Sequence, residues 1–220
     1  DVTNPLNPSN IGWGTPTTPG SDSNQPSQTI AWDASGSGDT ASYTVRLFSD
    51  MSCTSPFGTD TLVDVSITNL PVNGLPPGDY TFTVTTTDFA GNSSISGCSS
   101  SMSVDTTPPF NPSSLAWTET NGTAISFGST ITAPAIRANW VSGGEPDLEF
   151  VDVHLYESAT ANDLCTGSLV SSNTNLIASN TYTEFSALTG GKFYSFEVTI
   201  RDFAGNISQS ICSPGDVKIN

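Results

Sequence analysis

Four cysteines are the residues of this 220-residue chain whose spacing most directly suggests a chemistry. Cys53 and Cys98 lie 45 positions apart, and Cys165 and Cys212 lie 47 positions apart. Two matched pairs predict one disulfide in each half of the chain, Cys53–Cys98 and Cys165–Cys212, formed in an oxidising compartment. The alternatives are four buried free thiols or a zinc site, although the chain has no Cys-x-x-Cys pair and only one histidine, His154.

Carboxylates are the second group of residues that could carry out chemistry, since the chain has 21 Asp and Glu but only five Lys and Arg. The formal net charge of -16 argues against binding to nucleic acid or to anionic membrane surfaces. No Gly-x-Ser-x-Gly motif occurs, and one histidine leaves the first half without a histidine base. A carboxylate pair for glycoside hydrolysis would need a cleft that small sandwiches seldom offer. We therefore expect a protein that is not an enzyme.

The chain is a tandem repeat. The motif Asp-x-Thr-x-Pro-x-Asn-Pro-Ser-x-x-x-Trp occurs at residues 1–13 and 105–117, and Asp-Phe-Ala-Gly-Asn occurs at residues 88–92 and 202–206. Self-similarity over about 100 residues indicates two copies of one domain rather than an array of short units. The predicted domains are residues 1–104 and 105–220.

Hydrophobic alternation with a period of two predicts strands and no helix. Turn residues separate the alternating runs, so each domain is expected to be an antiparallel β-sandwich in an all-β chain. Trp32 and Trp140 are predicted to lie in the two cores, with Tyr80 and Tyr194 buried beside them. The in-phase apolar positions are Tyr43, Val45, Leu47, Tyr80, Phe82 and Val84 in the first copy, and Val151, Val153, Leu155, Tyr194, Phe196, Val198 and Ile200 in the second.

The early Trp32 and the sequence Leu-Pro-Pro-Gly-Asp-Tyr at residues 75–80 resemble a fibronectin type III domain. The second copy matches through Trp140, Leu188 and Tyr194, with one extra residue in the corner. The resemblance implies that each corner tyrosine hydroxyl bonds nearby backbone. The cysteines depart from that family and imply a loop after the third strand tied to the last strand.

The Asp-Phe-Ala-Gly-Asn turn and the linker at residues 104–109 are similar to bacterial immunoglobulin-like repeats of surface proteins and adhesins. Some such repeats bind calcium at domain junctions, and the topology of the sandwich would bring several carboxylates to one end. The expected second-copy ligands are Asp105, Asp202, Asp147 and Glu145, and the first-copy set is Asp1, Asp88, Asp33 and Asp39. The alternative is that the turn aspartates cap their own turns and the others are solvated charges.

A few further residues are expected at the surface of the two domains. His154 is expected to face solvent beside Tyr156, and Phe48 and Tyr156 to lie on the outer face under the loop that carries each first cysteine. Asn92, Asn121 and Asn206 head Asn-x-Ser/Thr sequons, which arise easily in a chain this rich in Asn, Ser and Thr.

The first functional hypothesis is a segment of a bacterial surface or secreted protein that acts as an adhesin stalk or tip, attaching to a protein or glycan on another cell. The second is a spacer in an extracellular polysaccharide-degrading enzyme, and the third is a receptor-like module that binds protein by strand edges or loops. Proline in the linker favours a semi-rigid connection. No membrane insertion is expected. Residues 217–220 fit either a true carboxyl terminus or an arbitrary boundary.

Overall fold

The computed structural model describes residues 1–14, 22–133 and 135–220, and contacts divide the chain into two compact units, residues 1–107 and 108–220. Every regular element in these described residues is a β-strand, which confirms the predicted all-β class. Within the same ranges no helix is long and apolar enough to cross a membrane.

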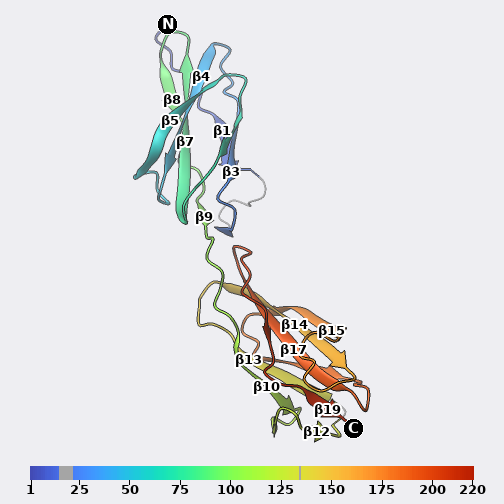
Figure 1. Ribbon diagram of the computed structural model, residues 1–220. Helices are drawn as coiled ribbons and strands as arrows, with labels where there is room; N and C mark the ends of the chain where they lie inside the picture. The colour runs from blue at the N-terminus through green and yellow to red at the C-terminus, as the bar shows by residue number, and fades with distance from the viewer. Residues whose placement is uncertain (15–21, 134) are drawn as a thin grey trace. The chain divides into compact units, whose positions relative to one another are not determined.

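Unit 1 consists of two sheets that share one core (Figure 1). Its small sheet has the order β1-β3-β6, and its large sheet has the order β2-β9-β7-β4-β5, with β8 paired to β7. All pairs are antiparallel except the short pair of β2 with β9. The strands are β1 (Ser9–Trp13), β2 (Asp22–Ser23), β3 (Gln28–Asp33), β4 (Thr40–Phe48), β5 (Pro56–Asp64), β6 (Asn69–Val72), β7 (Gly78–Asp88), β8 (Ser93–Ile95) and β9 (Met102–Val104).

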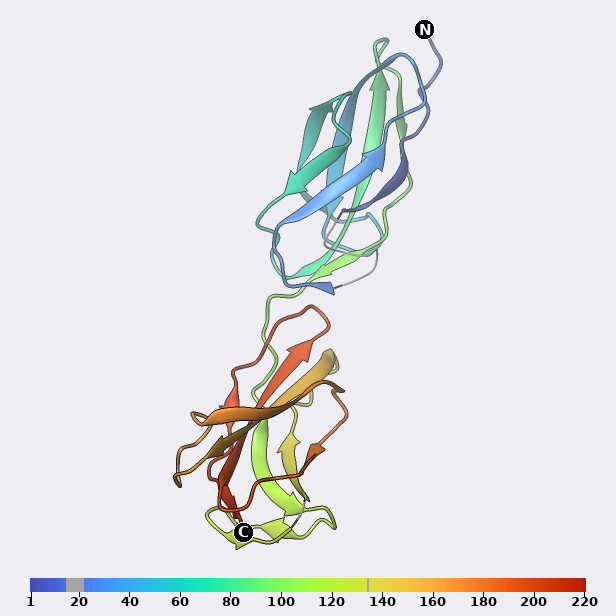
Figure 2. The ribbon, with the colours of Figure 1, turned by 90° about the vertical axis from the view of Figure 1, so that its right-hand side faces the viewer.

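Unit 2 repeats this plan with small additions at its margins. The small sheet has the order β11-β10-β13-β16, and the large sheet has the order β12-β19-β17-β14-β15, with β18 paired to β17. Figure 2 shows the two layers from the side. The strands are β10 (Ser113–Glu119), β11 (Ala124–Ile125), β12 (Thr130–Ile131), β13 (Ala135–Val141), β14 (Leu148–Ser158), β15 (Ser168–Ile177), β16 (Tyr182–Ser186), β17 (Phe193–Asp202), β18 (Ile211–Cys212) and β19 (Val217–Ile219).

Alternating side chains build each core from both sheets. In unit 1, Trp13 of the small sheet packs edge-on against Phe82 at a centroid distance of 5.2 Å, and Trp32 packs against Tyr43 at 5.6 Å. Trp117 meets Phe196 in the same way at 4.6 Å in unit 2. Edge-to-face pairs of this kind add to the burial of large apolar area. The predicted burial of Trp32 and Trp140 is confirmed, since both are at least 96% buried.

The corner tyrosines are also confirmed. Tyr80 is buried and donates its hydroxyl hydrogen to the carbonyl oxygen of Pro76 at 2.8 Å. Tyr194 is buried too, but its hydroxyl accepts from the backbone N–H of Thr189 and donates to Glu157 at 2.8 Å. In the second corner, which is one residue longer, the tyrosine hydroxyl therefore has different hydrogen-bond partners from those of Tyr80. Burial raises the pKa of both phenols above the ordinary value.

The side chains expected on the outer face differ in exposure. Phe48 is buried, Tyr156 is half-buried and donates to Glu197 at 2.8 Å, and His154 is half-buried with Nδ1 2.8 Å from Ser172 Oγ. Neighbouring strands and side chains therefore cover much of a face that the sequence pattern alone places toward solvent.

Removal of a core tryptophan is expected to be costly. Trp32→Ala should lower the free energy of unfolding by about 3–5 kcal/mol, because it deletes a large buried ring and leaves a cavity. Urea unfolding measures this loss, and Phe89→Ala, at a side chain that is 81% exposed, is the control and should change it by less than about 0.5 kcal/mol. A loss below about 1 kcal/mol for Trp32→Ala would contradict its place in the core.

Candidate functional site

Three carboxylates converge at one end of unit 1. Each of Asp1, Asp39 and Asp88 places a carboxylate oxygen within 4.8 Å of the other two. Asp88 ends β7, and the backbone carbonyl of Asp39 accepts the N–H of Phe89 at 3.2 Å, so the turn after β7 lies against the segment before β4. Of the predicted first-copy set, the fold brings these three together. Asp33 instead accepts a hydrogen bond from Asn10 at 2.5 Å.

Asp88 is already engaged by its own turn. Its Oδ1 accepts the N–H groups of Ala90 and Asn92 at 2.9 and 2.8 Å, and its Oδ2 accepts from the Asn92 side chain at 2.9 Å. These bonds, led by the one from the Asn92 side chain, lower the pKa of Asp88. Gly91 has a positive φ of 89°, which explains the glycine in the repeated motif. The turn-capping role considered from the sequence is therefore present.

Unit 2 repeats the turn at Asp202. Its carboxylate accepts from the backbone and side chain of Asn206 at 2.8 and 2.9 Å, and Gly205 has a φ of 90°. Asp147 occupies the place of Asp39, because its carbonyl accepts the N–H of Phe203 at 2.9 Å.

The two other carboxylates of the predicted second-copy set have their own local partners. Glu145 accepts the N–H of Phe110 with both oxygens at 3.0 Å. Asp105 belongs to unit 1, where its backbone N–H donates to Ser23 and its carboxylate accepts from Thr107. Asp105 corresponds to Asp1 through the sequence repeat.

The first-copy cluster suits a hard cation. Calcium takes oxygen ligands, and each carboxylate oxygen has two lone pairs. Asp88 Oδ2 accepts one described hydrogen bond, so one lone pair remains for an ion beside Asp1 and Asp39. Asp1, Asp39 and Asp88 thus fit such an ion without giving up the bonds of the turn.

Both predicted disulfides are present, and Cys53 and Cys165 lie after β4 and β14 as expected. Their partners precede the last strand of each unit, since Cys98 lies between β8 and β9 and Cys212 ends β18. Cys53 bonds Cys98 and Cys165 bonds Cys212, with Cα atoms 5.9 and 6.0 Å apart. Cys53 and Cys165 have positive φ angles of 57° and 51°, a conformation that costs an L-residue about 1–2 kcal/mol. Other contacts must therefore hold these loops.

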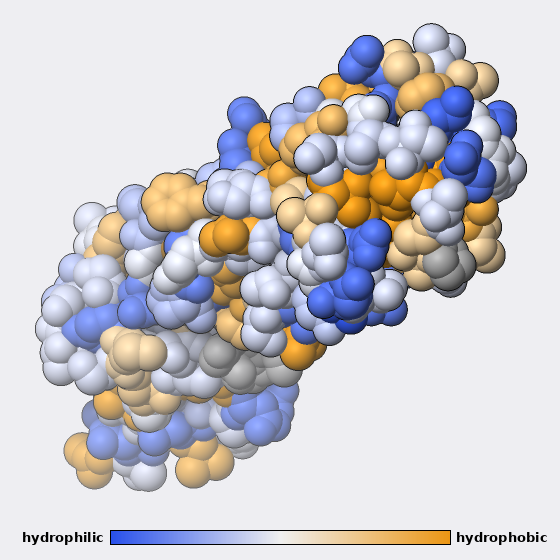
Figure 3. Space-filling model, turned by 90° about the horizontal axis from the view of Figure 1, so that it is seen from below, coloured by the Kyte–Doolittle hydropathy of each residue, from blue (hydrophilic) through white to orange (hydrophobic). Residues whose placement is uncertain are grey.

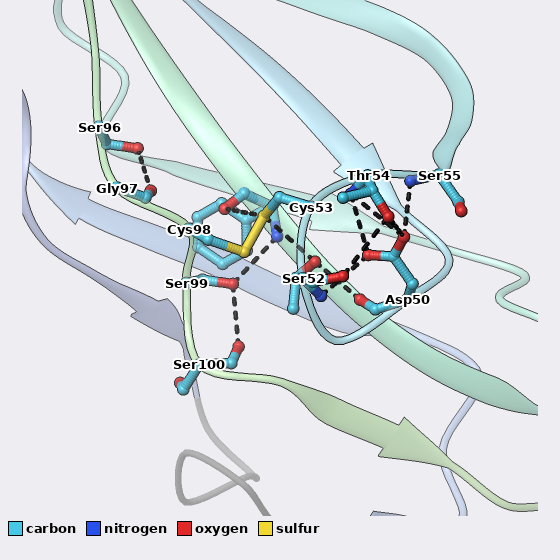
Figure 4. The surroundings of a disulfide bond; sticks show 12 residues. Asp50, Ser52, Cys53, Thr54, Ser55, Ser96, Gly97, Cys98, Ser99 and Ser100 are labelled. Carbon is cyan, nitrogen blue, oxygen red and sulfur yellow. Dashed lines mark hydrogen bonds between the residues drawn. A yellow bond between two sulfur atoms is a disulfide. The ribbon is translucent and has the colours of Figure 1, made fainter.

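Asp50 supplies those contacts in unit 1 (Figure 4). Its carboxylate accepts the N–H groups of Ser52, Thr54 and Ser55 as well as the Thr54 hydroxyl, at 2.5 to 3.1 Å. The bond from the Thr54 hydroxyl is the main cause that lowers the pKa of Asp50. In unit 2, Asp163 plays the same part with the hydroxyls of Thr166 and Ser158, and its pKa is lowered for the same reason.

Serine hydroxyls attach the segment around the second cysteine of each unit to the central strand, β7 or β17. Ser99, next to Cys98, accepts the N–H of Phe82 at 3.0 Å, and Ser96 accepts the N–H of Val84 at 3.0 Å. Ser213 and Ser208 accept the corresponding N–H groups in unit 2 at 3.2 and 2.9 Å. Hydroxyl oxygens rather than backbone carbonyls thus accept these N–H groups of the central strand, so the buried donors are satisfied.

The surface mixes polar and apolar residues. Figure 3 shows a face covered mainly by hydrophilic and neutral residues, with hydrophobic residues in separate patches. The phenylalanines of the repeated turn, Phe89 and Phe203, are 81% and 56% exposed. Both turns therefore carry an aromatic ring on the surface of their own unit.

Comparison with known proteins supports the fold. No protein-family model matches the chain, and no curated protein matches it. The FN1–FN3 domains of chicken CNTN1 align with a TM-score of 0.52 and 14% identity over 96% of this chain and 65% of that one. The fibronectin(III)-like modules of Clostridium thermocellum CbhA align with a TM-score of 0.51 and 12% identity over 96% and 94%.

The chain has the fold of two tandem fibronectin type III-like sandwiches. At these identities the likeness shows the fold and nothing about ligands. Each fibronectin type III-like unit departs from a plain sandwich by its disulfide and by the aspartate that caps the cysteine loop.

The capping carboxylates predict acid sensitivity. Asp50 has a lowered pKa in the folded chain, so its contribution to stability is present above the ordinary aspartate pKa of about 4 and is lost as the pH falls below it. Urea unfolding of the wild type and of Asp50→Asn should differ at pH 7 and converge toward pH 2. Asp79→Asn is the control, and a difference that persists unchanged at pH 2 would contradict the capping role of Asp50.

Proposed function

We propose that the chain is a non-catalytic segment of a bacterial surface or secreted protein, which serves as the stalk or tip of an adhesin. The single observation that carries this proposal is the disulfide that pins a capped loop to the segment before the last strand in both fibronectin type III-like units. Sandwiches of this kind are typically modules without catalysis. Disulfides form in oxidising surroundings, which supports an extracellular location.

The position of the bonds suits a load-bearing role. Cys53–Cys98 closes a loop of 45 residues and Cys165–Cys212 closes one of 47. Each loop contains most of the large sheet of its unit, including β7 or β17. A pulling force on the chain ends therefore cannot extend these residues while the bond is intact. Limited extension would help a surface protein to recover its fold after strain.

Calcium binding at the turn cluster of unit 1 is part of this proposal. The geometry of Asp1, Asp39 and Asp88 supports a site in the first copy. Bound calcium would offset the repulsion among carboxylates and stiffen the turn after the central strand.

The alternative function is a spacer module in an extracellular polysaccharide-degrading enzyme. The structural similarity to the fibronectin(III)-like modules of CbhA is compatible with a module embedded in a larger protein. A spacer would have no affinity of its own for surfaces. Binding of the chain to a surface would therefore distinguish an adhesin from a spacer.

Single-molecule pulling tests the mechanical role. The oxidised chain should unfold with a contour length that grows by about 150 Å per unit after reduction, because each residue released from a closed loop adds at most about 3.6 Å. Cys53→Ser with Cys98→Ser should show the longer step for one unit without reductant. Equal contour lengths before and after reduction would contradict the mechanical role.

A retention assay tests attachment. Beads that carry the full chain should stay, under flow, on at least one member of a panel of bacterial, plant and animal cells and insoluble polysaccharides. Albumin-coated beads are the control. Retention no greater than that control on every surface would favour the spacer.

Calorimetric titration tests calcium. After treatment with chelator, the chain should take up calcium and gain thermal stability, because the cation joins carboxylates that otherwise repel. Asp39→Ala should remove binding in unit 1, because it deletes one of the three converging carboxylates. Absence of heat and of any shift in Tm at millimolar calcium would leave these residues as turn caps and surface charges.

A further inference from the structure

The open side of the unit 2 sandwich contains a groove between β15 and β16, the edge strands of its two sheets. One cavity of about 400 Å³ lies there, and a second of about 330 Å³ adjoins it through Glu184, which lines both. Cavities of about 300 Å³ and more are large enough for small-molecule ligands.

Polar side chains line this groove at strand positions where the period-two pattern predicts inward-facing apolar residues. Glu157 follows Val153 and Leu155 in phase on β14, and its carboxylate accepts from Tyr194 and lies 3.5 Å from Lys192. The Asn173 side chain reaches across from β15 and donates to the Thr183 hydroxyl of β16 at 2.6 Å. The floor remains apolar, with Leu155, Phe185 and Leu188.

Several positions beside the groove have different residues at the equivalent positions of unit 1. Strand register pairs Ile30 with Leu70 there and Ala138 with Thr183 in unit 2, so two bulky apolar residues are replaced by a small one and a polar one. Glu157 likewise stands where the first copy has Ser49. Glu157, Asn173 and Thr183 therefore give unit 2 a polar wall on this side of the sandwich, where unit 1 has Leu70 opposite Ile30.

We propose that this groove binds a neutral saccharide chain, which would be the ligand of the attachment function proposed above. Hydroxyl, amide and carboxylate groups on the walls can both donate to and accept from sugar hydroxyls, while the apolar floor can cover the C–H face of a ring. Glu184 is paired with Arg137 and Glu157 with Lys192, so the groove offers no surplus cation for an acidic sugar. The net charge of the chain opposes polyanions further.

An extended peptide suits the groove less well. A peptide would add to the free edge of β15, but the register of β15 with β14 is interrupted at two places and Asn175 has a φ of 55°. Bulges of this kind prevent regular strand addition. On the β15 side of the groove, a ligand that uses side-chain hydrogen bonds rather than a backbone ladder is therefore favoured.

The test uses two-dimensional amide NMR of the full chain with neutral hexasaccharides of glucose, xylose, mannose and N-acetylglucosamine. At least one should shift the amide signals of β15 and β16 in a saturable way. Thr183→Leu copies the residue of unit 1 and fills the groove, so it should weaken binding by at least about tenfold while the chain stays folded. Glu157→Gln should also weaken binding, and Thr174→Leu, on an exposed position of β15, is the matched control.

Shifts that are lost in Thr183→Leu and kept in Thr174→Leu would support the proposal. No saturable shift with any hexasaccharide, or equal binding by Thr183→Leu, would overturn it. Shifts at β15 and β16 with a tryptic digest of casein, and none with the saccharides, would overturn it in favour of a peptide. The NMR titration needs no cell surface, so bead retention that persists in Thr183→Leu would sustain the adhesive function even if the groove proposal fails.

Discussion

The two sheets of each unit are joined by a tryptophan that packs edge-on against a phenylalanine of the central strand. Trp13 meets Phe82 and Trp117 meets Phe196, and all four side chains are at least 95% buried. The same phenylalanines donate their backbone N–H to Ser99 and Ser213, which directly follow Cys98 and Cys212. The core contact and the segment that carries the second cysteine are therefore fixed at one point of β7 or β17, and the capped loop depends on it.

Aspartate carboxylates stabilise individual loops and turns of each sandwich by accepting several hydrogen bonds at once. Asp50 gathers four donors around the loop of Cys53, and Asp88 does the same for the turn after β7. Charged acceptors form stronger hydrogen bonds than neutral ones, so short polar segments can be held without a large core beneath them. A chain with few cations thereby uses backbone N–H and hydroxyl groups as partners for many of its negative charges.

The two copies have the same frame and differ where an edge of the sandwich is open. Ile30 pairs with Leu70 on this side in unit 1, whereas Ala138 pairs with Thr183 in unit 2, and Thr183 lines the smaller cavity. Glu157 and Asn173 then bring polar groups into the space. A repeated domain can change such a site in one copy because the tryptophan–phenylalanine contact and the disulfide maintain the fold independently of it.

The sequence by itself determined the repeat, the alternation of the central strands, the burial of Trp32 and Tyr80, and the pairing of Cys53 with Cys98. Each of these follows from local period or from matched spacing, which need no knowledge of distant neighbours. Which acidic residues meet was decided only by tertiary structure. Asp39 approaches Asp88, whereas Asp33 turns to Asn10, because strand register and loop path set the direction of each side chain. The groove beside Glu157 was hidden for the same reason, since an in-phase acidic residue becomes a site only when two sheet edges leave space around it.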